Sequence, residues 1–576
     1  MRLLSLTVKC YRTLEDVTLQ FPNYYTAICG KNNSGKSNII RVIRSLFGEE
    51  ERFPFRDDVT ISHKADLTAW KREDSGTKDI AFTANVELNR AADRGLVEFI
   101  ERIAKSETNP LPIADQDIFT LSLHSTLKSD KTSPDTSVHI GSHVLDDVAS
   151  REIFKKLRSA STVVYHNSTQ TQFVYFSKRR RVHGMLSRLD DNSKQRLHSR
   201  SQSLKKEVDK ILETHRTELA TLIGKLDERI EVKLSAPEFD VDECPFEISL
   251  GYRGYDVSLD DWGSGTRNQT LILNSIFEAK KAAESPSVSD HITPLVLIEE
   301  PESFLHPLAQ AHFGNVLQDL TDELKIQVIA TTHSPYLLSH RNPTANILLA
   351  RTRRGRSSSP GPSSVIPVND TDWKEPFEHA LGIVGPEFEA FKAAVFSRSS
   401  VLILVEGDTD KAYFELCRAP EHGDNALTSV GELLPYGGWS ALTNTLLMRF
   451  IRDRFSKVIV TGDLDAEKNV SKHLENLGFK KGVTYFPVGI DAAGKRSIEG
   501  LLPESILQQV HVENPSLVNA LTSNLDEERK KSHRALKNKY LEKFKARASI
   551  QNGDFGQLYA LCRSITKAIH KQPELS

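Results

Sequence analysis

The chain opens with short segments in which apolar and polar residues alternate. Leu4–Val8 and Val17–Phe21 alternate with a period of two, which predicts half-buried antiparallel strands. Tyr25–Cys29 is a short apolar segment, and the apolar residues between Ile39 and Phe47 recur at helical spacing. A further alternating segment covers Ile80–Val86. The pattern therefore predicts three strands, a loop and an amphipathic helix at the start of the chain, with another strand after them.

A long, highly charged helical pattern occupies the region at about 185–235. Its apolar residues recur at helical spacing, with Lys, Glu and Asp between them. They are Leu204, Val208, Ile211, Leu212, Leu219, Leu222, Ile223 and Leu226. Two interpretations stay open for this insertion: a helical arm or dimerisation element, or a long helix that packs on its own domain.

The rest of the chain contains two blocks of strands and helices. The first block runs from about Glu247 to Ala350. Arg351–Ser364 follows it, and because this segment is poor in hydrophobic residues and rich in turn formers we expect an exposed flexible loop. Strands at Val401–Val405, Lys457–Thr461 and Thr484–Val488 indicate a second α/β block.

Length and composition fit a division into domains. A chain of 576 residues is too long for one hydrophobic core and predicts two to four domains. With 39% hydrophobic residues, 26% charged residues and a mean hydropathy of −0.38, it has enough apolar material for sizeable cores. We expect an α/β protein with a first domain at 1–375 and a second at 390–576, which ends in a helical tail.

Cysteine usage, hydropathy and charge bound the environment and the partners. Five single cysteines without a Cys-x-x-Cys pair are typical of a reducing compartment. The chain has neither a signal-peptide pattern nor 18 consecutive apolar residues, so we expect a cytoplasmic protein without a membrane partner. The net charge of −2 neither requires nor forbids nucleic acid, and the basic runs at 178–181, 529–531 and 537–545 are either solvated surface or phosphate contacts.

Gly30–Ser37 has the sequence of a phosphate-binding P-loop, G-x-x-x-x-G-K-[ST]. It follows an apolar strand and opens an amphipathic helix, which is the context that this motif requires. Lys36 is expected to reach the β- and γ-phosphates of ATP, and Ser37 is expected to bind Mg²⁺. Backbone N–H groups of the loop are expected to surround the phosphate oxygens. The predicted nucleotide-binding residues of the loop are Gly30, Asn32, Asn33, Ser34, Gly35, Lys36 and Ser37.

Two further apolar strands end in residues suited to ATP hydrolysis. Leu295–Ile298 runs into Glu299 and Glu300, two carboxylates that are costly to bury without a cation or a ligand. We expect Glu299 to hold Mg²⁺ or its water shell and Glu300 to orient and polarise the attacking water. A second strand ends at His333, where its position favours a sensor of the γ-phosphate.

Ser264 and Gly265 form a turn before an apolar helix, where the helix N-terminus favours anions. The order of P-loop, Ser-Gly turn, acidic strand and histidine strand resembles the ABC ATPases of the SMC and RecF type. The resemblance implies that Arg12 approaches the nucleotide, and that Ser264 and Gly265 of one subunit complete the site of another in a head-to-tail dimer. Two departures from the transporter pattern are visible: Glu299 replaces an aspartate, and the turn does not read LSGGQ.

Two strands of the second domain also run into acidic residues. The first is followed by Glu406 and Asp410, and the second by Asp463 and Asp465. Alternation along an extended chain is expected to send both aspartates of the second pair to the same side. Four carboxylates at neighbouring strand ends repel one another unless divalent cations neutralise them, and an all-oxygen set suits Mg²⁺ or Mn²⁺.

These acids resemble those of the Toprim fold. The spacing from Glu406 to Asp410 is similar to that of the OLD (overcoming lysogenisation defect) nucleases, in which a C-terminal Toprim domain follows an ABC ATPase. The resemblance implies two-metal hydrolysis of DNA phosphodiesters. It also implies one more acidic ligand, for which Glu499 is the candidate, and a late lysine. The candidate lysines are Lys537, Lys539, Lys543 and Lys545, of which Lys543 is preferred.

The predicted function is therefore an ATP-regulated DNA endonuclease with ATP and Mg²⁺ or Mn²⁺ as cofactors. It is expected to act as a homodimer or higher homo-oligomer in anti-phage defence or DNA processing. Two alternatives stay open. One is a nucleotide-gated DNA-binding scaffold with an inactive Toprim domain, and the other is a nuclease subunit that works only with a defence-system partner protein.

Overall fold

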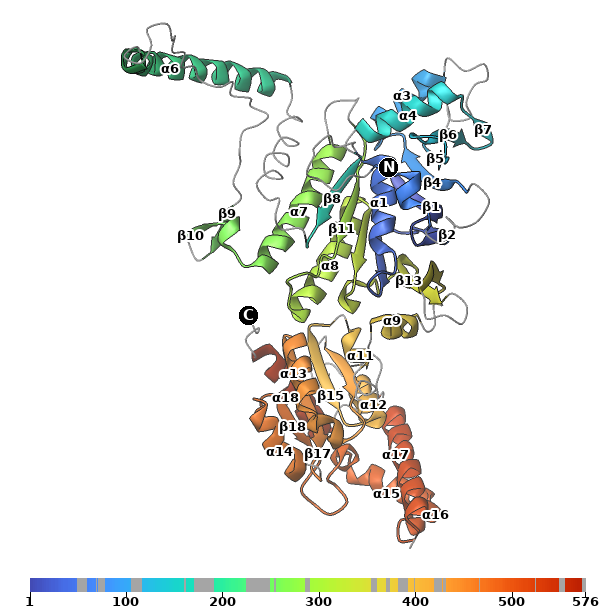
Figure 1. Ribbon diagram of the computed structural model, residues 1–576. Coiled ribbons are helices and arrows are strands. Elements are labelled where there is room, and N and C mark those ends of the chain that lie inside the picture. The colour runs from blue at the N-terminus through green and yellow to red at the C-terminus, as the bar shows by residue number, and fades with distance from the viewer. Residues whose placement is uncertain are drawn as a thin grey trace. The chain divides into compact units, whose positions relative to one another are not determined.

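The computed structural model describes most of the chain in two compact units (Figure 1). The first unit comprises Met1–Phe304 and Val316–Leu381, and the second comprises Leu305–Asn315 and Gly382–Ser576. The described residues are 1–48, 60–68, 70, 78–104, 116–159, 162–169, 191–223, 249–252, 255–284, 291–353, 360–368, 373–381, 392–397, 399–418, 427, 431–465, 467–523, 525–548 and 555–571.

The first unit contains an antiparallel sheet with the strand order β2-β1-β4-β5-β6-β7. Its strands are β1 (Arg2–Tyr11), β2 (Leu14–Gln20), β4 (Ile80–Asn89), β5 (Ile118–Leu127), β6 (Asp135–Ile140) and β7 (His143–Val144). Buried and half-buried residues alternate along β4, because successive side chains of a strand point to opposite faces. The strands predicted from alternation at the start of the chain are β1, β2 and β4, and all three are confirmed.

A second sheet in this unit carries the segments of the predicted nucleotide site, in the order β14-β13-β3-β12-β11-β8. Its strands are β3 (Tyr25–Gly30), β8 (Val163–Asn167), β11 (Leu295–Glu299), β12 (Val328–Thr332), β13 (Asn346–Arg353) and β14 (Pro360–Ile366). All neighbours from β13 to β8 pair in parallel. The P-loop, the acidic pair and the histidine therefore follow strands whose carboxyl ends share one edge of the sheet.

The expectation of an exposed flexible loop at 351–364 is wrong for the part that the structure describes. β13 and β14 form an antiparallel hairpin in which Arg351 pairs with Ser363, and 354–359 lie outside the described residues. Ser363 is buried. The prolines of β14 are tolerated because it is an edge strand, where a missing N–H removes no bond to a further strand.

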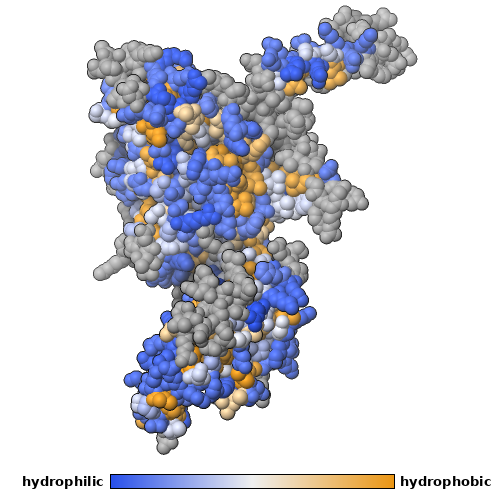
Figure 2. Space-filling view, turned by 180° about the vertical axis from the view of Figure 1, so that it is seen from behind, coloured by the Kyte–Doolittle hydropathy of each residue, from blue (hydrophilic) through white to orange (hydrophobic). Residues whose placement is uncertain are grey.

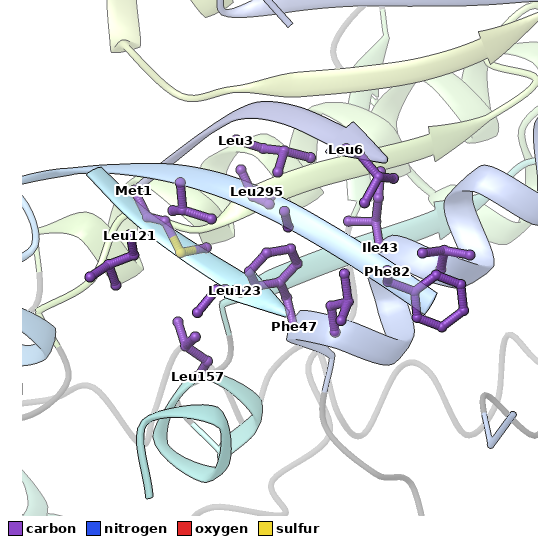
Figure 3. Close-up of a cluster of buried hydrophobic side chains, with 14 of the residues drawn as sticks. Met1, Leu3, Leu6, Ile43, Phe47, Phe82, Leu121, Leu123, Leu157 and Leu295 are labelled. Atoms are coloured by element: carbon purple, nitrogen blue, oxygen red, sulfur yellow. The ribbon is translucent and has the colours of Figure 1, made fainter. Parts of the chain in front are cut away.

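The helix that follows the P-loop, α1 (Lys36–Phe47), contributes to one hydrophobic core with residues of both sheets. Burying a large apolar side chain contributes ~1.5–3 kcal/mol, so this core fixes α1 firmly. Figure 3 shows Ile43 and Phe47 of α1 among side chains of β1, β4, β5, β11 and the helix at 147–159. Those labelled are Met1, Leu3, Leu6, Phe82, Leu121, Leu123, Leu157 and Leu295.

Several further helices and one small hairpin lie before residue 382 of the chain. The helices are α2 (His63–Asp66), α3 (Arg94–Ala104), α4 (Asp147–Ser159), α6 (Asp191–Ile223), α7 (Ser264–Ala283), α8 (Pro307–Leu324) and α9 (Lys374–Leu381), and the hairpin is β9 (Ser249–Tyr252) with β10 (Tyr255–Ser258). α6 confirms the predicted long helix over 191–223, while 224–234 lie outside the described residues. Its Leu204 is 49% exposed, and both interpretations of this helix stay open.

The second unit is a four-stranded parallel sheet in the order β16-β15-β17-β18. Its strands are β15 (Val401–Val405), β16 (Glu432–Pro435), β17 (Lys457–Asp463) and β18 (Tyr485–Val488). Its helices are α11 (Lys392–Val395), α12 (Asp408–Cys417), α13 (Thr445–Arg454), α14 (Glu467–Asn476), α15 (Glu504–Glu513), α16 (Pro515–Ala520), α17 (Asp526–Ala548) and α18 (Gly556–Lys571). Ile403 belongs to a core with α12, α17 and α18, whereas Leu402 and Leu404 belong to another with α13 and α14. The sheet is thus covered on both faces, as parallel sheets usually are.

The described surface is mostly hydrophilic in the view of Figure 2, with hydrophobic residues in small groups. Within the described residues, no helix combines the length and apolar character needed to cross a membrane.

Candidate functional site

The P-loop needs glycine where it packs against β13 and β14. Gly35 has a φ of 105°, in the left-handed region that favours glycine. A Cβ on Gly35 would lie 2.9 Å from Oγ of Ser363 and 2.9 Å from Oγ1 of Thr13. A Cβ on Gly30 would lie 2.3 Å from the carbonyl oxygen of Leu349. A side chain at either position would push the loop out of place.

Lys36 points back into the loop. Its Nζ donates to the carbonyl oxygen of Gly30 at 2.8 Å and to that of Lys31 at 3.2 Å. Burial lowers the pKa of Lys36, and nearby carboxylates at the end of β11 oppose this shift. Oγ of Ser34 is buried and has no hydrogen-bond partner in the part of the chain that the structure describes. An anion in the loop would satisfy both the hydroxyl and the ammonium group.

The other two residues predicted from the loop, Asn32 and Asn33, are exposed. Asn33 has a φ of 63°, a left-handed conformation that asparagine adopts more readily than most residues.

Ser37 and Glu299, the two expected Mg²⁺ ligands, are in direct contact. Oγ of Ser37 donates to Oε2 of Glu299 at 2.7 Å. The hydroxyl of Tyr165, on β8, donates to Oε1 of the same carboxylate at 2.7 Å. The guanidinium of Arg44 stacks over the Tyr165 ring, 3.9 Å from its centroid. A hydroxyl and a carboxylate side by side are an oxygen donor set that fits Mg²⁺.

Glu300 and His333 lie next to each other at the ends of β11 and β12. Oε1 of Glu300 is 3.9 Å from Nε2 of His333. Burial and the charge of Lys36 lower the pKa of His333, which favours the neutral form of its ring. The backbone N–H of His333 donates to Oε1 of Glu302 at 2.5 Å, and burial raises the pKa of Glu302 to about 7. Glu302 was not among the residues expected here.

Arg12 is held beside the first turn of α1. Its Nη1 donates to Oδ1 of Asn38 at 3.4 Å, and its Nε donates to Asp66 at 2.7 Å. Asn38 follows Ser37 directly and donates to Oγ1 of Thr13 at 3.1 Å. Arg12 is therefore linked to the helix turn that carries the last two P-loop residues.

Ser264 and Gly265 open α7, and Ser264 is exposed. One turn further, Asn268 is buried and forms a hydrogen bond through Oδ1 with Nε2 of His166 at 2.9 Å. Nδ2 of Asn268 donates to the carbonyl oxygen of Pro301 at 3.3 Å. The helix behind the Ser-Gly turn is thereby tied to β8 and to the turn that follows Glu300.

The second unit gathers acidic residues at the ends of β15 and β17. The backbone N–H of Asp463 donates to Oε2 of Glu406 at 3.0 Å. The N–H of Gly407 donates to Oδ2 of Asp410 at 3.2 Å, which fixes Asp410 in the first turn of α12.

Asp463 and Asp410 are buried, and both burial and neighbouring carboxylates oppose the ionisation of their side chains. Burial and the charge of Asp410 raise the pKa of Asp463 to about 9. Burial and the charge of Glu499 raise the pKa of Asp410 to about 6. Oδ1 of Asp463 is buried and, within the described residues, has no hydrogen-bond partner. A bound cation would reduce the repulsion between these carboxylates and would give Oδ1 of Asp463 a partner.

Glu499 and Lys537 join these aspartates from later in the chain. Glu499 stands in a 3-10 helix (Ile498–Leu501) and accepts from Oγ of Ser497 at 2.6 Å. Nζ of Lys537 lies 3.3 Å from its Oε1. Burial acts to lower the pKa of Lys537, but the nearby carboxylates outweigh it and the pKa is raised. Lys537 therefore stays protonated beside the acids.

The preference for Lys543 is corrected by the structure. Its Nζ pairs with Oε1 of Glu513 at 2.8 Å, and both side chains are partly exposed. Lys543 lies six positions after Lys537 in the chain. Because a helix has 3.6 residues per turn, the two lysines lie on different sides of α17.

The expectation that Asp463 and Asp465 point to one side is also wrong. β17 ends at Asp463, and the chain turns at Leu464, whose N–H donates to the carbonyl oxygen of Val488 at 3.0 Å. Alternation applies only while the chain stays extended. Asp463 is consequently buried, whereas Asp465 is exposed.

The acidic residues of the second unit are of the type that binds a divalent cation, but their side chains are not arranged around a common metal position. Across the described ranges, no three His, Cys, Asp or Glu side chains are already assembled around one metal position. The donors are all carboxylate oxygens, and one buried oxygen of Asp463 lacks a partner among the described residues. Mg²⁺ and Mn²⁺ are the ions that such donors suit. The residues that would hold them are Glu406, Asp410, Asp463 and Glu499.

The P-loop, the acidic strand end and the histidine on one parallel sheet define a P-loop ATPase. The chain belongs to the AAA ATPase domain family, whose match covers residues 1–338.

Similarity to characterised proteins beyond this family is partial. Over 92 residues the chain is 38% identical to an OLD nuclease of Thermus scotoductus, and the match spans 16% of this chain and 16% of that protein. Among solved structures, it resembles an SMC head bound to the C-terminal winged-helix domain of ScpA, at 17% identity and a TM-score of 0.38, over 65% of this chain and 100% of that one. It also resembles the SMC head domain of Thermotoga maritima, at 17% identity and a TM-score of 0.31, over 64% of this chain and 100% of that one.

Proposed function

We propose that this chain is an ATP-regulated, metal-dependent DNA endonuclease of the OLD type, with a Toprim-like nuclease site in the second unit. The observation that carries the proposal is the gathering of four acidic side chains and one lysine around the ends of two parallel strands. They are Glu406, Asp410, Asp463, Glu499 and Lys537. The partial match to an OLD nuclease supports the same assignment.

In this proposal each side chain has a defined task. Divalent cations bound there would supply two-metal phosphodiester hydrolysis. Glu406 and Asp463 would bind them directly, and Asp410, one methylene shorter than glutamate, would bind through water. Lys537 balances the charge of Glu499 and, because it remains protonated, would donate to a phosphate oxygen of the DNA backbone.

The ATPase unit would regulate cutting through assembly. Ser264 is exposed at the N-terminus of α7, so it is available to the nucleotide site of a second subunit. Asn268 forms a hydrogen bond between α7 and the turn after Glu300. This bond would connect the Ser-Gly turn at the start of α7 to the acidic end of β11 in the nucleotide site. A homodimer is therefore the proposed working form.

The test is cleavage of supercoiled plasmid by the full chain with Mg²⁺ or Mn²⁺, with and without ATP. Asp463→Asn should abolish cutting while ATP hydrolysis continues, because it removes a metal ligand and leaves the ATPase site intact. Asp453→Asn, on the exposed end of α13, is the matched control and should cut normally.

Cutting that survives Asp463→Asn would refute the assignment of the nuclease site. No cutting by the unaltered chain, with ATP still hydrolysed, would contradict an autonomous nuclease and favour a DNA-binding scaffold or a nuclease that needs a partner protein.

A further inference from the structure

Tyr165 belongs to none of the ATPase motifs, yet its hydroxyl reaches the centre of the nucleotide site. Nδ2 of Asn167 donates to the Tyr165 hydroxyl at 3.2 Å. The phenol proton is therefore directed to Oε1 of Glu299, 2.7 Å away. Oε2 of Glu299 accepts a hydrogen bond from the hydroxyl of Ser37 at 2.7 Å. Each oxygen of this carboxylate is thus held by a different element, β8 on one side and α1 on the other.

The Tyr165 ring is itself fixed in place. β8 pairs in parallel with β11, with Tyr165 opposite Leu297 and Asn167 opposite Glu299. The ring packs against the core of the first unit, and the guanidinium of Arg44 stacks on it at 3.9 Å. A rigid, protonated donor is suited to orienting a carboxylate.

A glutamate at this position needs such an orienting group more than an aspartate does. Its extra methylene adds a rotatable bond, so more side-chain entropy is lost when the carboxylate is held in one orientation. We infer that Tyr165 is a positioning residue, which holds Glu299 in the orientation that meets Ser37 and thereby sets the affinity of the ATPase site for the metal–nucleotide complex. The inference depends on the ATPase site and is independent of the proposed nuclease.

The first experiment measures nucleotide binding, without reference to turnover. A fluorescent ATP analogue is titrated onto the full chain at increasing Mg²⁺ concentration, for the unaltered protein and for Tyr165→Phe. Phenylalanine keeps the ring under Arg44 and removes only the hydroxyl. Because loss of a group that orients a metal ligand typically costs about 10–100-fold in metal affinity, the Mg²⁺ concentration at half-saturation should rise about tenfold or more. Binding of the analogue in EDTA should not change.

The matched control is Tyr25→Phe, which removes another buried tyrosine hydroxyl from the same sheet. Tyr25 donates to the carbonyl oxygen of Leu337 at 2.6 Å and does not touch Glu299. This variant should unfold at a lower temperature but keep the Mg²⁺ dependence of the unaltered protein. An equal shift in both variants would show a general effect of stability and would overturn the inference.

A double-mutant cycle separates positioning from packing. In a Glu299→Asp background the shorter carboxylate no longer reaches the phenol, so adding Tyr165→Phe should cause no further change in Mg²⁺ dependence. The same tenfold shift in both backgrounds would refute the link between the two side chains. An unchanged Mg²⁺ dependence in Tyr165→Phe alone would refute it as well.

Discussion

Lys537 should stabilise the second unit by neutralising the acids around it. Its side chain is 23% exposed and that of its partner Glu499 is 6% exposed, so the pair is largely sheltered from water. Breaking a buried ion pair typically costs ~3–5 kcal/mol. Since Lys537 is partly exposed, we expect a loss of about 1–3 kcal/mol for Lys537→Met at pH 7.5 without divalent cation. For a unit of this size, that corresponds to a melting temperature lower by roughly 2–10 °C.

Lys543→Met is the matched control, because it removes the same side chain from the same helix. Lys543 and Glu513 are 31% and 43% exposed, and surface pairs contribute ~0–1 kcal/mol. Calorimetric unfolding of the full chain measures both variants. Mg²⁺ should restore much of the stability lost in Lys537→Met, because a cation among the acids replaces the missing charge. Equal losses in the two variants, or no recovery with Mg²⁺, would refute this reasoning.

Three further predictions concern the first unit. Gly35→Ala should weaken ATP binding at least tenfold in an equilibrium titration, because its Cβ would lie 2.9 Å from Oγ1 of Thr13; unchanged affinity would contradict the packing described for the loop. Lys36→Ala should lower the affinity for ATP and leave the metal dependence of the proposed DNA cleavage unchanged, and normal ATP affinity would remove Lys36 from the nucleotide site. Burial and the neighbouring His139 lower the pKa of His124 below 6.5, so its contribution to stability is present above that pH and is lost as pH falls. The His124→Asn variant should therefore lose less stability between pH 8 and pH 5 than the unaltered chain, as measured by urea unfolding. An identical loss in both proteins would contradict the expected effect of His124 on the pH dependence of stability.

The P-loop and the strand ends were predictable because their chemistry is encoded in adjacent residues. A glycine-rich loop between an apolar strand and an amphipathic helix has few other interpretations. Two carboxylates after a run of buried residues likewise require a compensating charge. The sequence therefore predicts that Lys36 and Ser37 begin a helix and that Glu299 ends a strand, as they do in α1 and β11.

The residues that the sequence did not reveal depend on pairing between distant segments. Tyr165 reaches Glu299 only because β8 lies beside β11, with Tyr165 opposite Leu297. Nothing in the segment around Tyr165 distinguishes it from a core aromatic residue. The choice between Lys537 and Lys543 depends on the rotation of α17 about its axis, which its weak apolar pattern does not determine.

Composition was misleading where packing overrode it. The prolines and serines near residue 360 indicate a loop, but an edge strand tolerates them. Ser363 is buried there and donates its backbone N–H to the carbonyl oxygen of Thr13 at 2.7 Å. Turn-forming residues are therefore a poor guide at the margin of a sheet.

The position of β3 in its sheet has a consequence for synthesis of the chain on the ribosome. β3 is fully buried between β12 and β13, so the strand before the P-loop gains its neighbours only after residue 328, about 300 residues later. At a translation rate of ~5–20 residues per second, β3 has no pairing partner for roughly 15–60 s after its synthesis. During that time the nucleotide loop has no sheet to anchor it, and an apolar strand is open to aggregation. ATP binding by nascent chains should therefore begin only once β13 has emerged, and early folding of this protein should depend on chaperones that shield apolar strands.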